Sequence, residues 1–219
     1  MIRFSPSFIC LLAFAFGPVV AEAGSIRKPA AEKRYNFRDG DIVLQGNAGP
    51  QSDAVRAATG SPYTHCGVVF QHEGKWMVME AVQPVRTTPL EQFIDRSLAG
   101  TFRAYRLRET VGADAVAKAR AWATKQAGKN YDVRFQWNDT ELYCSEFVWK
   151  LYEQAGVELC PKRAFRTYNL DDPAVKQIIE QRYGGRANLP LDEPAVAPGD
   201  IATSKLLIEA PRIETKKMR

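Results

Sequence analysis

One segment organises this chain: residues 142–152, which read LYCSEFVWKLY. Phe147 and Leu151 are four residues apart, and so are Val148 and Tyr152. Residues at this spacing lie on the same face of an α-helix. The segment is therefore predicted to form an amphipathic helix whose apolar face packs against the rest of the fold.

The predicted ends of this helix place Cys144 in its first turn. Residues 138–140, Asn-Asp-Thr, are residue types that cap a helix start, and Gly156 is a favourable terminator. At a helix N-terminus the dipole and the free amides favour a thiolate over a thiol. Cys144 is therefore a candidate nucleophile. The alternative is a small buried residue, since most free cysteines pack as apolar side chains.

A β-hairpin upstream supplies a candidate base. Strands are predicted over 65–70 and 76–82, joined by a four-residue turn at 71–74. With this turn, counting back along the two strands places His65 directly opposite Glu80. Opposed residues share one face of a sheet and lie within contact distance.

A carboxylate beside an imidazole fixes its tautomer and stabilises the imidazolium, as the third member of a catalytic triad does. Glu80 is also a charge in an otherwise apolar strand, where a lone charge is rarely tolerated. The alternative is a salt bridge at the strand end that involves no catalysis. The other histidine, His72, lies in the predicted turn. Cys66 is a rival nucleophile, but alternation along the strand directs it to the face opposite His65, where we expect it to pack against a helix.

Two further helices are predicted from local signals. Thr88 and Pro89 begin one that runs to about Asp95, with proline at the first helical position. The other is rich in alanine and covers residues 113–127.

Several short motifs occur along the chain in the following order. They are GDIV at 40–43, THCGVV at 64–69, Glu80, Tyr131-Asp132 and YCSEFV at 143–148. Together they resemble the YiiX/YebB-like branch of the permuted papain-like cysteine hydrolases in the NlpC superfamily. The histidine precedes the cysteine, whereas papain-like enzymes usually have the reverse order, so the resemblance is to a circularly permuted form.

The resemblance implies an α+β fold, in which a small antiparallel, barrel-like sheet packs against helices. It makes Cys144 the nucleophile, His65 the base and Glu80 the orienting group. It also makes Tyr131 and, more weakly, Tyr63 candidate substrate contacts, although each could equally be an ordinary half-buried tyrosine.

The chain divides into three predicted parts. Residues 1–23 have a positively charged start, an apolar run from 8 to 16 and a small-residue cleavage site, as in a secretory signal peptide. The apolar run is too short to span a bilayer, although a retained anchor is the alternative. Residues 24–37 are predicted to be a flexible lead-in, and residues 38–210 the hydrolase domain. We therefore expect an exported protein, periplasmic or secreted, without an integral membrane anchor after cleavage.

The net charge, the cysteine count and the lack of metal-ligand patterns limit the classes of function that the sequence supports. The net charge of +5 is not accompanied by the clustered lysines and aromatics of a nucleic-acid-binding surface, so no nucleic-acid partner is expected. Cys66, Cys144 and Cys160 remain after residue 23, an odd number that leaves at least one thiol unpaired within the chain. Cys160, next to Pro161 and Lys162, is expected to be the more exposed. The sequence has no zinc-ligand pattern, and the proposed chemistry requires no metal or cofactor.

The leading interpretation is an exported cysteine hydrolase of amide bonds, with cell-wall peptides as one substrate class. A second interpretation is a hydrolase or acyltransferase acting on lipid esters. A third is a ligand-binding protein that kept the fold without turnover. The sequence indicates neither the oligomeric state nor a second oxyanion donor.

Overall fold

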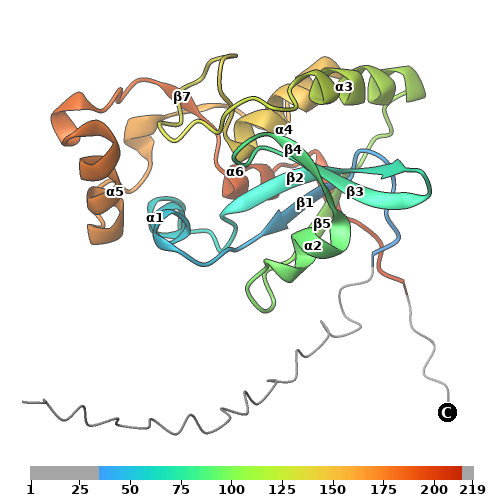
Figure 1. Cartoon of the computed structure of the whole chain (residues 1–219), viewed down its shortest axis with the longest axis horizontal. Coiled ribbons are helices and arrows are strands. Elements are labelled where there is room, and N and C mark those ends of the chain that lie inside the picture. Colours follow the sequence, from blue (N-terminus) through green and yellow to red (C-terminus); the bar gives the residue numbers. More distant parts are fainter. Residues whose placement is uncertain (1–34, 214–219) are drawn as a thin grey trace, which may run out of the picture.

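The computed structural model describes residues 35–213. Its centre is a six-stranded antiparallel sheet with the strand order β4-β3-β2-β1-β5-β8 (Figure 1). A separate two-stranded ladder pairs β6 with β7. The strands are β1 (Ile42–Gln45), β2 (His65–His72), β3 (Lys75–Glu80), β4 (Arg86–Pro89), β5 (Arg103–Leu107), β6 (Arg163–Ala164), β7 (Pro194–Ala195) and β8 (Leu207–Glu209).

Helices cover both faces of this sheet. In Figure 1, α3 and α4 lie above the sheet, α2 lies below it, and α1 and α5 stand together at one side. This combination confirms the predicted α+β class. The helices are α1 (Pro50–Thr59), α2 (Leu90–Asp95), α3 (Ala113–Lys125), α4 (Cys144–Gln154), α5 (Pro173–Tyr183) and α6 (Pro198–Ala202), with short 3-10 turns at Phe165–Thr167 and Arg186–Asn188.

The central hairpin has a shorter turn than the sequence pattern predicted. Only Glu73 and Gly74 form the turn, and both have positive φ angles, of 48° and 76°, as a two-residue type I′ turn requires. Val68 consequently pairs with Met79 rather than Met77. The predicted register was wrong by two residues. Because side chains alternate with a period of two, a slip of this size leaves every residue on its predicted face.

Helix α4 is buried on all its sides along most of its length. Every residue from Cys144 to Tyr152 is buried. The prediction that only one apolar face of this helix is buried was therefore wrong. Its polar side chains find partners inside the protein. The Ser145 hydroxyl donates to the Val196 carbonyl at 2.6 Å, and Glu146 pairs with Lys150 at 2.9 Å. Buried polar groups of this kind are tolerated because they are paired.

The start of α4 also differs from the prediction. The helix begins at Cys144, and the amide of Tyr143 donates to the Glu146 carboxylate at 3.3 Å. Asn138 forms its own turn instead, since its side-chain oxygen accepts from the amides of Thr140 and Glu141 at 2.8 and 3.1 Å. Residues 138–140 therefore do not cap the helix, but Cys144 lies in the first turn as predicted.

Three apolar clusters hold these layers together. The first joins α3, α4 and α6 to one sheet face, and the second lies on the other face around α2. The third, between α1 and α5, contains Ala54, Val175 and Ile179. The third cluster matters for the site because it forms the side wall of a cavity described below.

The observed domain is slightly longer than the predicted one. Tyr35 is buried and, with Phe37, packs in the second cluster, so assigning these two residues to the lead-in was wrong. Tyr35 also forms an isolated β-bridge with Arg212. The predicted signal peptide, residues 1–23, and most of the lead-in lie outside the described residues.

Within residues 35–213, no helix has both the length and the apolar character needed to cross a membrane.

Candidate active site

The candidate nucleophile lies where α4 meets the sheet. Cys144 is the first residue of α4, and His65 is the first residue of β2. Both side chains are buried, with Cys144 only 4% exposed and His65 only 6%. The N-terminal end of α4 and the N-terminal end of β2 lie next to each other at one end of the sheet, which brings the two residues together. The Cys144 thiol lies within hydrogen-bonding range of the His65 imidazole.

His65 is held on its other side by Glu80. The His65 Nε2 atom lies 2.5 Å from Glu80 Oε2, and this carboxylate is fully buried. The observed register makes the two residues diagonal neighbours across the hairpin rather than direct partners. Gly67 occupies the place opposite Glu80, where an added Cβ would lie 2.5 Å from Val78 Cγ1, 2.8 Å from the Met79 carbonyl oxygen and 3.3 Å from Glu80 Cβ. A side chain at this position would therefore crowd Glu80, whose carboxylate reaches along the diagonal to His65.

Two residues that the sequence reasoning missed complete the environment of Glu80. The Thr88 hydroxyl donates to Glu80 Oε1 at 2.6 Å, and Arg96 Nη2 lies 2.7 and 2.9 Å from the two carboxylate oxygens. Burial alone would raise the pKa of Glu80, but its bonds to His65, Thr88 and Arg96 lower it to about 2. Glu80 is therefore ionised across the physiological range.

These two partners were missed because Thr88 was assigned to the wrong element. It was expected to cap a helix, whereas it lies in β4, and α2 begins at Leu90. A clue was available: a charge buried in the middle of a fold needs a counter-charge, and Arg96 is a nearby arginine in the sequence.

The pKa values indicate an ion pair between Cys144 and His65. Burial acts to lower the pKa of His65, but hydrogen bonds to Cys144 and Glu80 outweigh it and raise the pKa to about 9. A hydrogen bond from the Cys66 thiol is the largest effect that lowers the pKa of Cys144. Burial opposes it, and His65 adds to it, so the pKa falls well below that of an ordinary thiol. The arrangement favours a thiolate beside an imidazolium.

The other two cysteines differ from Cys144. Cys66 lies in the cluster that contains α4, as expected from strand alternation, and burial raises its pKa well above the ordinary value. Its thiol contacts Cys144, which the sequence did not indicate. Cys160 is 8% exposed, and burial raises its pKa to about 12. Cys160 is the most exposed of the three thiols, as expected, but it is still buried, and the expected lowering of its pKa by Lys162 was wrong. The three cysteines among the described residues are all free.

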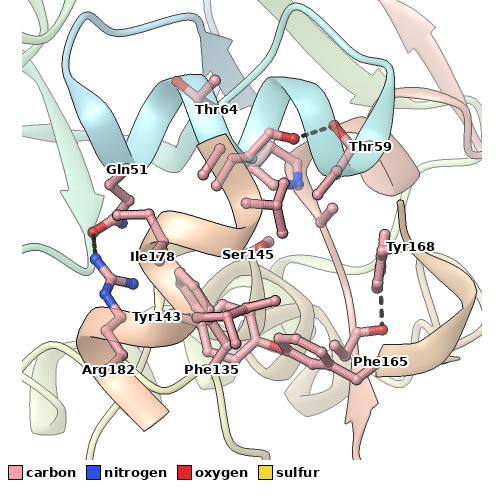
Figure 2. Close-up of a pocket in the computed structure, with 18 of the residues that line it drawn as sticks. Gln51, Thr59, Thr64, Phe135, Tyr143, Ser145, Phe165, Tyr168, Ile178 and Arg182 are labelled. Carbon is pink, nitrogen blue, oxygen red and sulfur yellow. Dashed lines mark hydrogen bonds between the residues drawn. The ribbon is translucent and has the colours of Figure 1, made fainter. Parts of the chain in front are cut away.

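A cavity of about 110 Å³ opens beside Cys144. Its wall comes mainly from α1 and α5, which carry Gln51 and Arg182 on facing sides (Figure 2). Tyr131 lines this cavity, whereas Tyr63 does not. The Tyr63 hydroxyl lies instead 3.4 Å from that of Tyr105. Most of the lining is apolar and includes Ala54, Val55, Ala58, Phe165, Leu170, Val175, Ile178 and Ile179.

Known proteins share this sequence and architecture. Residues 36–208 match the family described as permuted papain-like amidase enzymes, YaeF/YiiX, C92 family. The chain belongs to this family. It is 34% identical over 177 residues to the uncharacterized protein YiiX of Escherichia coli strain K12, a match that covers 80% of this chain and 84% of YiiX.

A solved structure agrees with the family assignment. It is the crystal structure of YiiX from Escherichia coli O157:H7, which is described as a metalloprotein, and it superposes with a TM-score of 0.75 at 33% identity. The match covers 80% of this chain and 97% of the YiiX chain. The resemblance and the permuted papain-like fold predicted from the motifs are thereby confirmed. Membership of the C92 amidase family supports a cysteine hydrolase of the amidase type.

Proposed function

We propose that this protein is an exported cysteine hydrolase that cleaves an amide bond, with Cys144 as nucleophile, His65 as base and Glu80 as orienting group. The observation that carries the proposal is the position of the imidazole between the other two groups. His65 interacts with Cys144 on one side and with the buried Glu80 carboxylate on the other. The signal-like sequence of residues 1–23 supports export, to the periplasm or the medium.

In this mechanism the Cys144 thiolate attacks a carbonyl carbon and forms a tetrahedral intermediate. The amide N–H of Cys144, at the first position of α4, needs no acceptor within the helix and can donate to the developing oxyanion. Since Nε2 of His65 is engaged by Glu80, the Nδ1 atom transfers its proton to the leaving nitrogen. A water that loses a proton to His65 then attacks the thioester, releases the carboxylic acid and restores the thiolate–imidazolium pair.

The cavity beside Cys144 indicates which kind of substrate could bind next to the nucleophile. Its charged lining group, Arg182, is already engaged by Gln51 and the Val133 carbonyl, at 2.6 and 2.8 Å. The rest of the wall is largely apolar, so the part of the substrate next to the scissile bond is expected to be uncharged and apolar. This observation favours a second candidate function, hydrolysis or transfer of the acyl chain of a lipid ester.

The description of E. coli O157:H7 YiiX as a metalloprotein raises the question of a metal site in this chain. In the part of the chain that the structure describes, no group of three or more His, Cys, Asp or Glu side chains is arranged to hold a metal ion. These residues therefore do not fit a metal centre, and no step of the proposed mechanism passes through one.

Mass spectrometry of the full chain with two substrate sets tests the proposal. The protein is incubated with peptidoglycan fragments or with lipid esters, and both turnover and the mass of the Cys144 peptide are followed. Release of a carboxylic acid from peptide amides, lost in Cys144→Ala, supports the amidase. Turnover or a thioacyl adduct with lipid esters alone supports the second candidate. If neither set gives turnover or an adduct, the result contradicts the proposal and favours a binding protein of the same fold.

A further inference from the structure

A series of hydrogen-bonded side chains runs from α5 toward the nucleophile. Arg182 Nη2 donates to Gln51 Oε1 at 2.6 Å (Figure 2), and Gln51 Nε2 donates to the Tyr131 hydroxyl at 3.0 Å. Tyr131 and Cys144 line one cavity, and burial together with interaction with Cys144 raises the pKa of the Tyr131 hydroxyl. All four residues line the same cavity.

Arg182 fixes the orientation of the Gln51 side-chain amide. A guanidinium only donates hydrogen bonds, so the group that faces it must be the amide oxygen. The NH₂ group of Gln51 is then turned toward Tyr131. Arg182 is itself fixed by its bond to the Val133 carbonyl and by its place 5.3 Å from the centre of the Phe135 ring.

The orientation of Gln51 decides where the Tyr131 proton goes. A phenol has one proton to donate, and its oxygen can accept. Because Gln51 donates to this oxygen, the Tyr131 proton cannot point at Gln51. The proton is then free to point toward Cys144, which lines the same cavity and would carry the oxyanion of a bound acyl group.

We infer that Gln51 and Arg182 are positioning residues that aim the Tyr131 hydroxyl at the reacting centre, where it is the second donor to the oxyanion. The inference rests on the proposed function, since it needs an acyl intermediate on Cys144. Tyr131 touches the reacting atoms, whereas Gln51 and Arg182 act only through it.

The decisive variant is Gln51→Glu. A carboxylate keeps a partner for Arg182, so the contact between α1 and α5 survives, but it can only accept from Tyr131. The Tyr131 proton then turns away from Cys144. Loss of one oxyanion donor typically lowers kcat by about 10²–10³-fold, so Gln51→Glu and Tyr131→Phe should each cause a loss of this order.

The probe is p-nitrophenyl butyrate, a short apolar ester whose acylation of Cys144 releases a coloured phenolate. The acylation rate constant at saturating probe is measured separately from KM in the full chain. Gln51→Met, which neither donates nor accepts strongly, should lose less than Gln51→Glu. Adding Gln51→Glu to Tyr131→Phe should cause no further loss, since the two changes remove the same interaction. Gln177→Glu, an exposed charge change on α5, should leave the rate unchanged.

The outcomes distinguish a failed inference from a failed function. If Tyr131→Phe reacts as fast as the parent, Tyr131 is not an oxyanion donor. If Tyr131→Phe is slow but Gln51→Glu is fast, or if their losses multiply, the positioning role of Gln51 and Arg182 is overturned. If the parent reacts no faster than Cys144→Ala with this ester and also fails to hydrolyse peptide amides, the proposed function itself fails, and the inference falls with it.

Discussion

Replacement of Glu80 by glutamine probes the link between the hairpin and the nucleophile. The rise in the pKa of His65 from 6.5 to about 9 corresponds to roughly 3 kcal/mol at about 1.4 kcal/mol per pH unit. Cys144 and Glu80 both raise this pKa, against the effect of burial. Loss of the Glu80 charge removes one of these two effects, and each pH unit by which the pKa of His65 falls lowers the population of the ion pair about tenfold.

Glu80→Gln would also change the tautomer of the His65 imidazole, which lowers the population of the ion pair further. Thr88 and Arg96 both donate toward Glu80 Oε1, so the oxygen of a glutamine is held on their side. Its NH₂ group then faces Nε2 of His65, and that atom must accept. The imidazole proton is left on Nδ1, and His65 can no longer take a proton from Cys144. A wrong tautomer of this kind can cost up to about 10⁴-fold in kcat.

The assay is the rate of iodoacetamide labelling of Cys144, resolved by site and measured against pH after reduction. With Glu80 present, the thiolate persists well below the ordinary thiol pKa, and labelling is fast at pH 6. In Glu80→Gln the imidazolium is less stable, so the pKa of Cys144 rises and the labelling curve moves to higher pH. We expect labelling at pH 6 to slow by tenfold or more, with the difference disappearing near pH 9.

Glu91→Gln is the matched control, because Glu91 is an exposed carboxylate on α2, and its labelling curve should not move. A folded Glu80→Gln protein whose Cys144 curve coincides with that of the parent would refute the reasoning.

Two further predictions concern side chains buried around α4. Cys66→Ala removes the thiol that donates to Cys144 and should slow iodoacetamide labelling of Cys144 at pH 6. Cys66→Ser keeps a donor and should slow the labelling less. If both variants and the parent gave the same dependence of labelling rate on pH, this contact would have no role. Lys150→Met leaves Glu146 without the ammonium group 2.9 Å away. Because burial already raises the pKa of Glu146 to about 7, the carboxyl can take up a proton, so the free energy of unfolding should fall by about 1–3 kcal/mol, and by more as the pH rises above 7. Denaturant titration at pH 6 and pH 8 measures this change, and adding Glu146→Gln should recover part of it; an equal loss at both pH values would contradict this role of Glu146.

The sequence alone determined the elements that depend on local spacing. The i, i+4 apolar pairs identified α4, because helix geometry fixes which residues share a face. The capping signal at 138–140 placed Cys144 in the first turn, and that position is correct although these residues do not cap the helix. Strand alternation placed His65 and Glu80 on one face and Cys66 on the other. That result survived a register error of two residues, since the side-chain period in a strand is also two. The order of the motifs identified the family.

Tertiary structure alone decided the contacts between elements that are distant in sequence. Thr88 and Arg96 around Glu80, and Gln51 and Arg182 around Tyr131, come from β4, the end of α2, α1 and α5. Tyr63 was a weaker candidate substrate contact, but it does not line the cavity, and its hydroxyl lies 3.4 Å from that of Tyr105. The physical reason is that local spacing fixes only which face a side chain occupies. Which residue lies across from that face depends on how the layers pack, and that packing is set by the whole apolar core at once.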